Sequence, residues 1–165
     1  MVTLPTTEDT PVIRTDFSDQ DAWDAVRAAI LAPGDDGELF TARVEFVDDP
    51  GFADRTPEQI LALVTDKFAD SHPCLFIVDT TTVSSADWPV LVMDLCEEKG
   101  RTFRTIADQL FSVESNLSVS NMDFSEFADA ADGNGVFQGF GGPPRSVLKA
   151  KLPPFMLNPS KHRIQ

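Results

Sequence analysis

The sequence has no tyrosine, only two histidines and two cysteines, and no acidic residue after Asp132. The lack of tyrosine removes a common general acid, and His72 and His162 cannot form a zinc site or a histidine-based triad unless the C-terminal segment folds in. No window approaches the roughly 20 apolar residues that cross a bilayer, and Met1–Asp9 has no basic region followed by an apolar stretch. We therefore expect a cytoplasmic protein that has no membrane partner.

The two cysteines, Cys74 and Cys96, lie within or at the end of apolar runs of the sequence. A thiol in such surroundings behaves as a small buried hydrophobic group and is unreactive. We expect both cysteines to be packed and inert.

Charge is divided unevenly along the chain. Residues 1–138 hold 8 basic and 27 acidic side chains, a net charge of −19, whereas the last 27 residues carry +5. Phosphate groups must be neutralised by Lys and Arg, so this balance argues against nucleic acid as a partner and favours a basic protein. The alternative is that the acidity serves only solubility.

Hydrophobic periodicity predicts a single α/β domain with a mixed sheet of about five strands and packed helices, because two strand–helix units precede a meander. The link between Cys74–Val78 and Val90–Leu95 is too short for a crossover helix, so these two strands should pair antiparallel. The other predicted strands cover Pro11–Phe17, Thr41–Val47, Thr102–Ile106 and the edge segment Val136–Phe140. The predicted helices cover residues 22–30, 57–68 and 124–131, and a short helix with a packed connection is expected within 108–120.

Three of these helices have recognisable starts. Ser18 offers a capping hydroxyl to the first helix, Thr56 and Gln59 form a capping box at the second, and Asp123 and Glu126 form another at the last. We place the domain at residues 1–140 and a basic, proline-containing tail at 141–165.

Several segments resemble a known family. They are Thr15–Ser18, Val44–Pro50, Asn116–Phe124 and Gly135–Phe140. Together they are similar to an actinobacterial domain of unknown function that spans roughly residues 8–140. The resemblance implies one ordered domain ending near Phe140, and it brings no catalytic residue.

Acidic residues follow three predicted strands. Asp16, Asp48, Asp49 and Asp79 stand where the carboxyl ends of strands gather ligands in α/β sheets. Such carboxylates could bind Mg²⁺. However, the sequence after Asp79 lacks the second aspartate of a phosphatase motif, no lysine accompanies the group, and 27 acids place some at strand ends by chance.

The tail combines charge with a short apolar segment. Its basic residues include Arg145, Lys149 and Lys151, and Phe155, Met156 and Leu157 form three consecutive large apolar side chains. Low hydrophobicity is what keeps a segment disordered, so these three residues predict a covered surface. The tail could dock on its own acidic body, on a second copy of the chain, which would give a homo-oligomer, or on another protein.

These observations favour a non-enzymatic protein–protein interaction module, of the immunity or adaptor kind, with no cofactor and a protein partner of basic character. The alternative is a Mg²⁺-dependent hydrolase or phosphotransfer domain that uses the strand-end aspartates.

Overall fold

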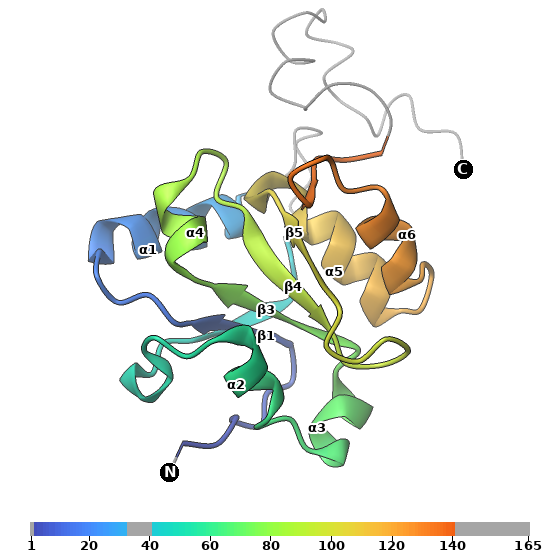
Figure 1. The fold of residues 1–165 in the computed structure, drawn as a ribbon, viewed down its shortest axis with the longest axis horizontal. Helices are drawn as coiled ribbons and strands as arrows, with labels where there is room; N and C mark the ends of the chain where they lie inside the picture. The colour runs from blue at the N-terminus through green and yellow to red at the C-terminus, as the bar shows by residue number, and fades with distance from the viewer. Residues whose placement is uncertain (1, 33–40, 141–165) are drawn as a thin grey trace, which may run out of the picture.

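A computed structural model describes residues 2–32 and 41–140 of the chain. Six strands form one mixed sheet in this structure (Figure 1). The strand order is β2-β1-β3-β4-β5-β6, with β1 parallel to β2 and β3, β3–β4–β5 antiparallel, and β6 parallel to β5. The chain is a single α/β domain, as predicted, and its sheet has six strands instead of about five. The strands are β1 (Thr10–Arg14), β2 (Val44–Val47), β3 (Cys74–Val78), β4 (Val90–Asp94), β5 (Thr102–Thr105) and β6 (Val136–Phe137).

Helices cover both faces of the sheet (Figure 1). On one face lie α1 (Gln20–Leu31), α5 (Leu110–Ser118) and α6 (Phe124–Asp129), which pack on Val12, Phe76 and Val92. The other face carries the 3-10 turn η1 (Pro50–Phe52), α2 (Pro57–Leu61) and α3 (Asp66–Ser71), packed on alternate residues such as Ile13 and Ile77. Burial on both faces explains why β1, β3 and β4 read as continuous apolar runs.

The helix starts follow the sequence with two differences. The capping box at α2 is present, because Thr56 Oγ1 accepts from the Gln59 backbone N–H at 3.1 Å and Gln59 returns the contact at 2.9 Å. The helix expected over 57–68 is instead two short helices, since Thr65 caps a second start at α3. At α1 the cap is Asp19, which accepts from Ala22, and Ser18 binds Asp16 instead.

The connection from β3 to β4 contains a short helix that the sequence did not predict, α4 (Thr80–Ser84). It does not cross the sheet, so β3 and β4 still pair antiparallel as predicted. A further 3-10 turn, η2 (Ala107–Gln109), leads from β5 into α5. No helix in the described ranges is long and apolar enough to cross a membrane.

Candidate functional site

The strand-end aspartates lie at one edge of the parallel part of the sheet. Asp48 directly follows β2 and Asp79 directly follows β3, while Asp16 stands two residues beyond β1, the strand between them. Because β1, β2 and β3 run parallel, their carboxyl ends meet at the same edge. The topology therefore brings these residues to the region where ligands bind in many α/β proteins.

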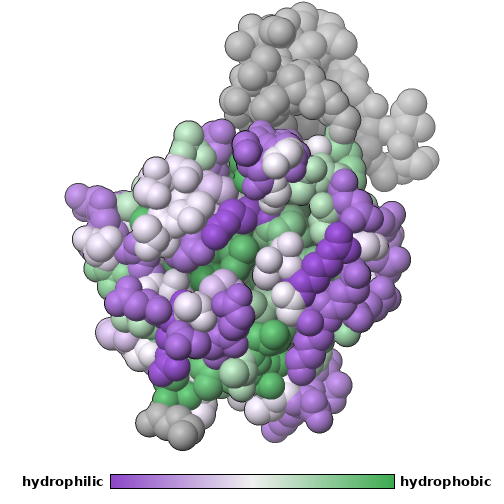
Figure 2. All heavy atoms as spheres, in the orientation of Figure 1, coloured by the Kyte–Doolittle hydropathy of each residue, from purple (hydrophilic) through white to green (hydrophobic). Residues whose placement is uncertain are grey.

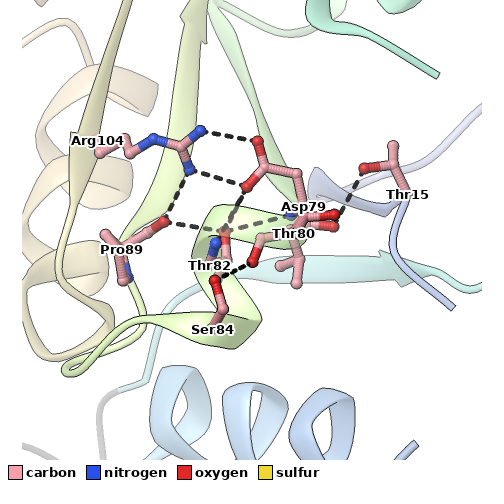
Figure 3. Close-up of polar contacts among 8 residues, drawn as sticks. Thr15, Asp79, Thr80, Thr82, Ser84, Pro89 and Arg104 are labelled. Carbon is pink, nitrogen blue, oxygen red and sulfur yellow. Dashed lines mark hydrogen bonds and ion pairs between the residues drawn. The ribbon is translucent and has the colours of Figure 1, made fainter. Parts of the chain in front are cut away.

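The central contact at this edge is an ion pair between Asp79 and Arg104 (Figure 3). Arg104 Nη1 donates to Asp79 Oδ1 at 2.9 Å and Nη2 donates to Oδ2 at 2.8 Å, so the pairing is bidentate. Arg104 stands on β5, and its side chain reaches across β4 to the end of β3. Only 20% of the Arg104 side chain and 22% of the Asp79 side chain are exposed. The pair ties three neighbouring strands together.

Asp79 also begins α4. Its Oδ1 accepts from the Thr82 backbone N–H at 3.1 Å, and the Thr82 hydroxyl donates to the Pro89 carbonyl at 2.9 Å. Arg104 Nη1 reaches the same carbonyl at 3.1 Å (Figure 3). The carboxylate, the guanidinium and the α4 cap therefore form one closed network, in which both charges already have partners.

The ionisation of Asp79 follows from this network. Burial acts to raise the pKa of Asp79, but the hydrogen bonds and positive charge of Arg104, with the Thr82 contacts, outweigh it and hold the pKa below its ordinary value. Asp79 is thus a charged group at neutral pH, and its charge is neutralised inside the protein.

Asp16 has a different set of partners. Its Oδ1 accepts from the Ser18 hydroxyl at 2.6 Å and from the Ser18 backbone N–H at 2.8 Å. The hydroxyl contact is the main reason why the pKa of Asp16 lies below its ordinary value, and a hydrogen bond from Thr80 adds to it. Asp16 is buried and shapes the loop between β1 and α1.

Asp48 pairs with Arg14, whose side chain is only 3% exposed. Arg14 Nη1 lies 3.1 Å from Asp48 Oδ1, and Nε donates to the Asp16 carbonyl at 3.0 Å. The guanidinium also stands 4.3 Å from the centre of the Phe17 ring, a cation–π distance. Asp49 turns to its own loop, where it accepts from the Gly51 N–H at 2.8 Å and caps η1.

The sequence placed four aspartates at strand ends, and the structure gives each a local partner. Within residues 2–32 and 41–140, no group of three or more His, Cys, Asp or Glu side chains has the arrangement to hold a metal ion. Arg14 and Arg104 were missed as members of this region. Two signals could have found them: Arg14 ends the buried strand β1, and Arg104 stands beside the buried Phe103 of β5.

The remaining sequence predictions have mixed outcomes. Cys74 is fully buried, and burial raises the pKa of its thiol above the ordinary value. Cys96 is exposed, so the prediction that it is packed was wrong. Cys96 follows Asp94 in the exposed β4–β5 turn, where its backbone N–H binds the Asp94 carboxylate. The tail residues Arg145, Lys149, Lys151 and Phe155–Leu157 lie outside the described residues.

The structure defines an α/β domain with a mixed sheet. Of the aspartates at the ends of its parallel strands, Asp48 and Asp79 pair with arginines, and Asp16 and Asp49 accept hydrogen bonds within their own loops. The chain belongs to the family described as a domain of unknown function, DUF6924, whose model matches residues 9–140. The match ends where the described part of the chain ends, at Phe140. A comparison with curated proteins finds no match.

We expect this edge not to bind Mg²⁺ tightly, because Arg14 and Arg104 occupy oxygens that a metal would need. Calorimetry with Mg²⁺ or Mn²⁺ should show no micromolar binding to the unmodified chain. Asp79→Asn should leave the titration unchanged, and Asp66→Asn on α3 serves as a matched control. Micromolar binding that only Asp79→Asn abolishes would contradict this expectation and favour the metal-dependent alternative.

Proposed function

We propose that this protein is a non-enzymatic interaction module of the immunity or adaptor kind, which works in the cytoplasm of an actinobacterial host. The observation that carries the proposal is the charge of the folded body. Residues 2–32 and 41–140 hold 24 acidic and 8 basic side chains, an excess of 16 negative charges. Complementary potentials of this kind speed and orient the encounter with a basic partner.

The internal ion pairs support the proposal of an acidic interaction surface, because they engage several of the eight basic side chains of the folded body. Arg14 and Arg104 serve the sheet edge, and Arg101 joins Glu98 at 2.7 Å to Asp129 at 2.8 Å. Most arginines of the body are thus already paired with acidic side chains, while the excess of acidic side chains remains. Figure 2 shows hydrophilic residues, in purple, over α6 and the β4–β5 turn. Hydrophobic residues, in green, appear near the centre of the view and have hydrophilic residues on both sides.

The tail supplies the second part of the proposal. Arg145, Lys149 and Lys151 carry the charge that an acidic surface attracts, and Phe155–Leu157 supply apolar area to bury there. The body of the same chain, a second copy and another protein are the candidate surfaces. A single Phe or Leu side chain, once fully buried, contributes roughly 1.5–3 kcal/mol, more than an exposed ion pair usually does.

One observation favours the second candidate function, a Mg²⁺-dependent hydrolase or phosphotransfer domain. Asp16 and Asp79 follow the adjacent parallel strands β1 and β3, at the edge where α/β folds bind ligands. The arginine partners of Asp48 and Asp79 weigh against it, since a hydrolase would need those oxygens open.

The tail proposal predicts a specific response to salt and protease. Charged contacts weaken as the Debye length falls from about 10 Å at 0.1 M to about 3 Å at 1 M salt, while apolar burial does not. With the natural partner present, trypsin should spare residues 145–157 at both salt concentrations. Phe155→Ser with Leu157→Ser should release the segment at both.

The control places the same change elsewhere: Phe111→Ser with Val119→Ser alters two exposed apolar side chains on or beside α5 and should leave the tail protected. Rapid cleavage near Lys149 in the unmodified chain, at every salt concentration and with every partner supplied, would mean that the tail docks on nothing. Affinity capture from the host, with and without residues 141–165, then identifies whether the partner is basic.

A further inference from the structure

Strand β2 stands at the end of the sheet and pairs with β1 on one side. In the part of the chain that the structure describes, no strand pairs with its other side. The parallel register sets Thr10 beside Val44, and the Thr10 N–H donates to the Arg43 carbonyl at 3.2 Å. In this ladder the backbone groups of alternate residues face β1, so those of Val44 and Phe46 face away from the sheet.

The side chains of β2 and its approach divide sharply between the two faces. Ala42, Val44 and Phe46 pack with the core on the α1 side, where Phe46 meets the Trp23 ring edge-on at 5.8 Å. On the opposite face, Arg43 and Glu45 are exposed, and 84% of the Arg43 side chain is accessible. The edge therefore presents an apolar row on one face and two opposite charges on the other.

This pattern is complementary to itself. If a second β2 approaches antiparallel with the twofold axis at Val44, the outward backbone groups of Val44 bond to those of the other copy's Val44. Arg43 of each copy then stands opposite Glu45 of the other, in the non-hydrogen-bonded positions where cross-strand side chains are closest. On the opposite face, Ala42 stands against Phe46 and Val44 against Val44, so apolar meets apolar throughout.

Other registers lose this match. An axis at Glu45 would set the two Glu45 carboxylates against each other, and like charges directly opposite are destabilising. An axis at Phe46 would place Val44 against Asp48, a carboxylate that Arg14 already holds. Of these three axes, only the one at Val44 pairs both the charges and the apolar residues.

We propose that β2 is a homodimerisation edge, at which two copies of this chain join antiparallel about Val44 into one continuous sheet. Edge strands are normally protected by lysines, prolines or inward charges that block pairing. The charges here do not block a second copy, because Arg43 meets Glu45 on both sides of the axis. Glu114 holds this edge in place, since its buried carboxylate accepts from the Arg43 backbone N–H at 2.9 Å.

Two charge effects oppose the dimer. Asp9 lies 3.7 Å from the Arg43 guanidinium and competes for it, at the long end of ion-pair distances. Each chain also carries a net charge of −14, so two copies repel one another over the whole surface. Salt near 0.15 M screens that long-range repulsion more than it screens close pairs within the interface, and is the condition for the test.

Charge reversal tests the pairing in the full chain by sedimentation velocity over a range of protein concentrations. Arg43→Glu and Glu45→Arg should each raise the dimer dissociation constant at least about tenfold, because each turns two attractions into two repulsions. The double variant Arg43→Glu with Glu45→Arg should restore it to within about threefold. Arg55→Glu, an equal charge change away from the edge, should leave dimerisation unchanged.

The proposal is overturned if the unmodified chain remains monomeric up to millimolar concentration, if either single reversal has no effect, or if the double variant stays as weak as the singles. Each result is interpretable because both side chains are exposed and neither anchors the fold.

Cross-linking then tests the register. Antiparallel residues in a hydrogen-bonded pair have Cα atoms about 5.5 Å apart, within the range that a disulfide spans. In a Cys96→Ser background, Val44→Cys should oxidise to a covalent dimer, whereas Glu45→Cys should not. The reverse outcome would overturn the axis at Val44.

Discussion

Phe127→Ala is expected to lower the free energy of unfolding by about 3–5 kcal/mol, as truncation of a buried phenylalanine usually does. Phe127 on α6 is fully buried, and its ring lies 5.1 Å from Phe137 and 6.4 Å from Phe103. The substitution therefore opens a cavity between α6, β5 and β6. Because whole domains are stable by only about 5–15 kcal/mol, this single change removes a large share of the total.

Urea unfolding followed by tryptophan fluorescence measures the effect, because Trp23 is fully buried in the same core as Phe127 and Trp88 packs partly buried against it. The matched control is Phe140→Ala, since the Phe140 ring contacts Phe127 at 5.3 Å but is 52% exposed. It should cost about 1 kcal/mol or less. Equal losses at the two positions would mean that α6 does not close this core.

Arg104→Ala is expected to cost about 2–4 kcal/mol, between the small value of exposed ion pairs and the larger value of fully buried ones. The substitution leaves the Asp79 carboxylate, which is only 22% exposed, without its bidentate partner. It also disconnects β5 from the end of β3. Arg55→Ala, which removes an exposed arginine bonded to the Gly51 carbonyl, should cost far less.

The cost of Arg104→Ala should depend on pH in a defined direction. The pKa of Asp79 in the folded chain lies below its ordinary value of 3.8, because Arg104 outweighs the effect of burial. A lowered folded pKa means that the contribution is fully present above about pH 4 and is lost as pH falls through the folded value. Without Arg104 the effect of burial on Asp79 is opposed only by the Thr82 contacts, so the difference between the unmodified chain and Arg104→Ala should be largest near neutral pH and shrink as pH falls.

A double-mutant cycle with Asp79→Asn isolates the pair. Asparagine keeps the capping geometry at α4 but lacks the charge, so the coupling energy reports Arg104 and Asp79 and leaves the cap intact. A coupling energy near zero at pH 7 would show that the contact between Arg104 and Asp79 does not stabilise the folded chain.

Much of the fold could be predicted from the sequence because local signals agree with global packing. The run Cys74–Val78 is apolar throughout, and the structure buries it on both faces of the sheet centre. Thr56 and Gln59 satisfy each other at the start of α2 as the sequence pattern requires. Where a local signal was read too broadly, as over 57–68, a second cap at Thr65 divided the helix.

The candidate site was harder to predict, for a physical reason. Strand order, and therefore the meeting of Asp16 and Asp79, follows from topology, and the sequence could anticipate it. The partners of those carboxylates could not be anticipated in the same way. Arg104 lies 25 residues from Asp79 in the chain and reaches it across another strand, a contact that no local spacing encodes.

The sheet order also determines how the chain gathers during folding. The meander β3–β4–β5 joins strands that are close in sequence, so its contacts form with little loss of loop entropy. Strand β1 must instead find β3 across more than 60 residues, as the bond between Thr15 and the Val78 carbonyl illustrates. Strand β2 can join only after β1 has docked. The antiparallel strands β3–β4–β5 should consequently nucleate the fold. The backbone amides of β2 should be the last to gain protection from hydrogen exchange with solvent.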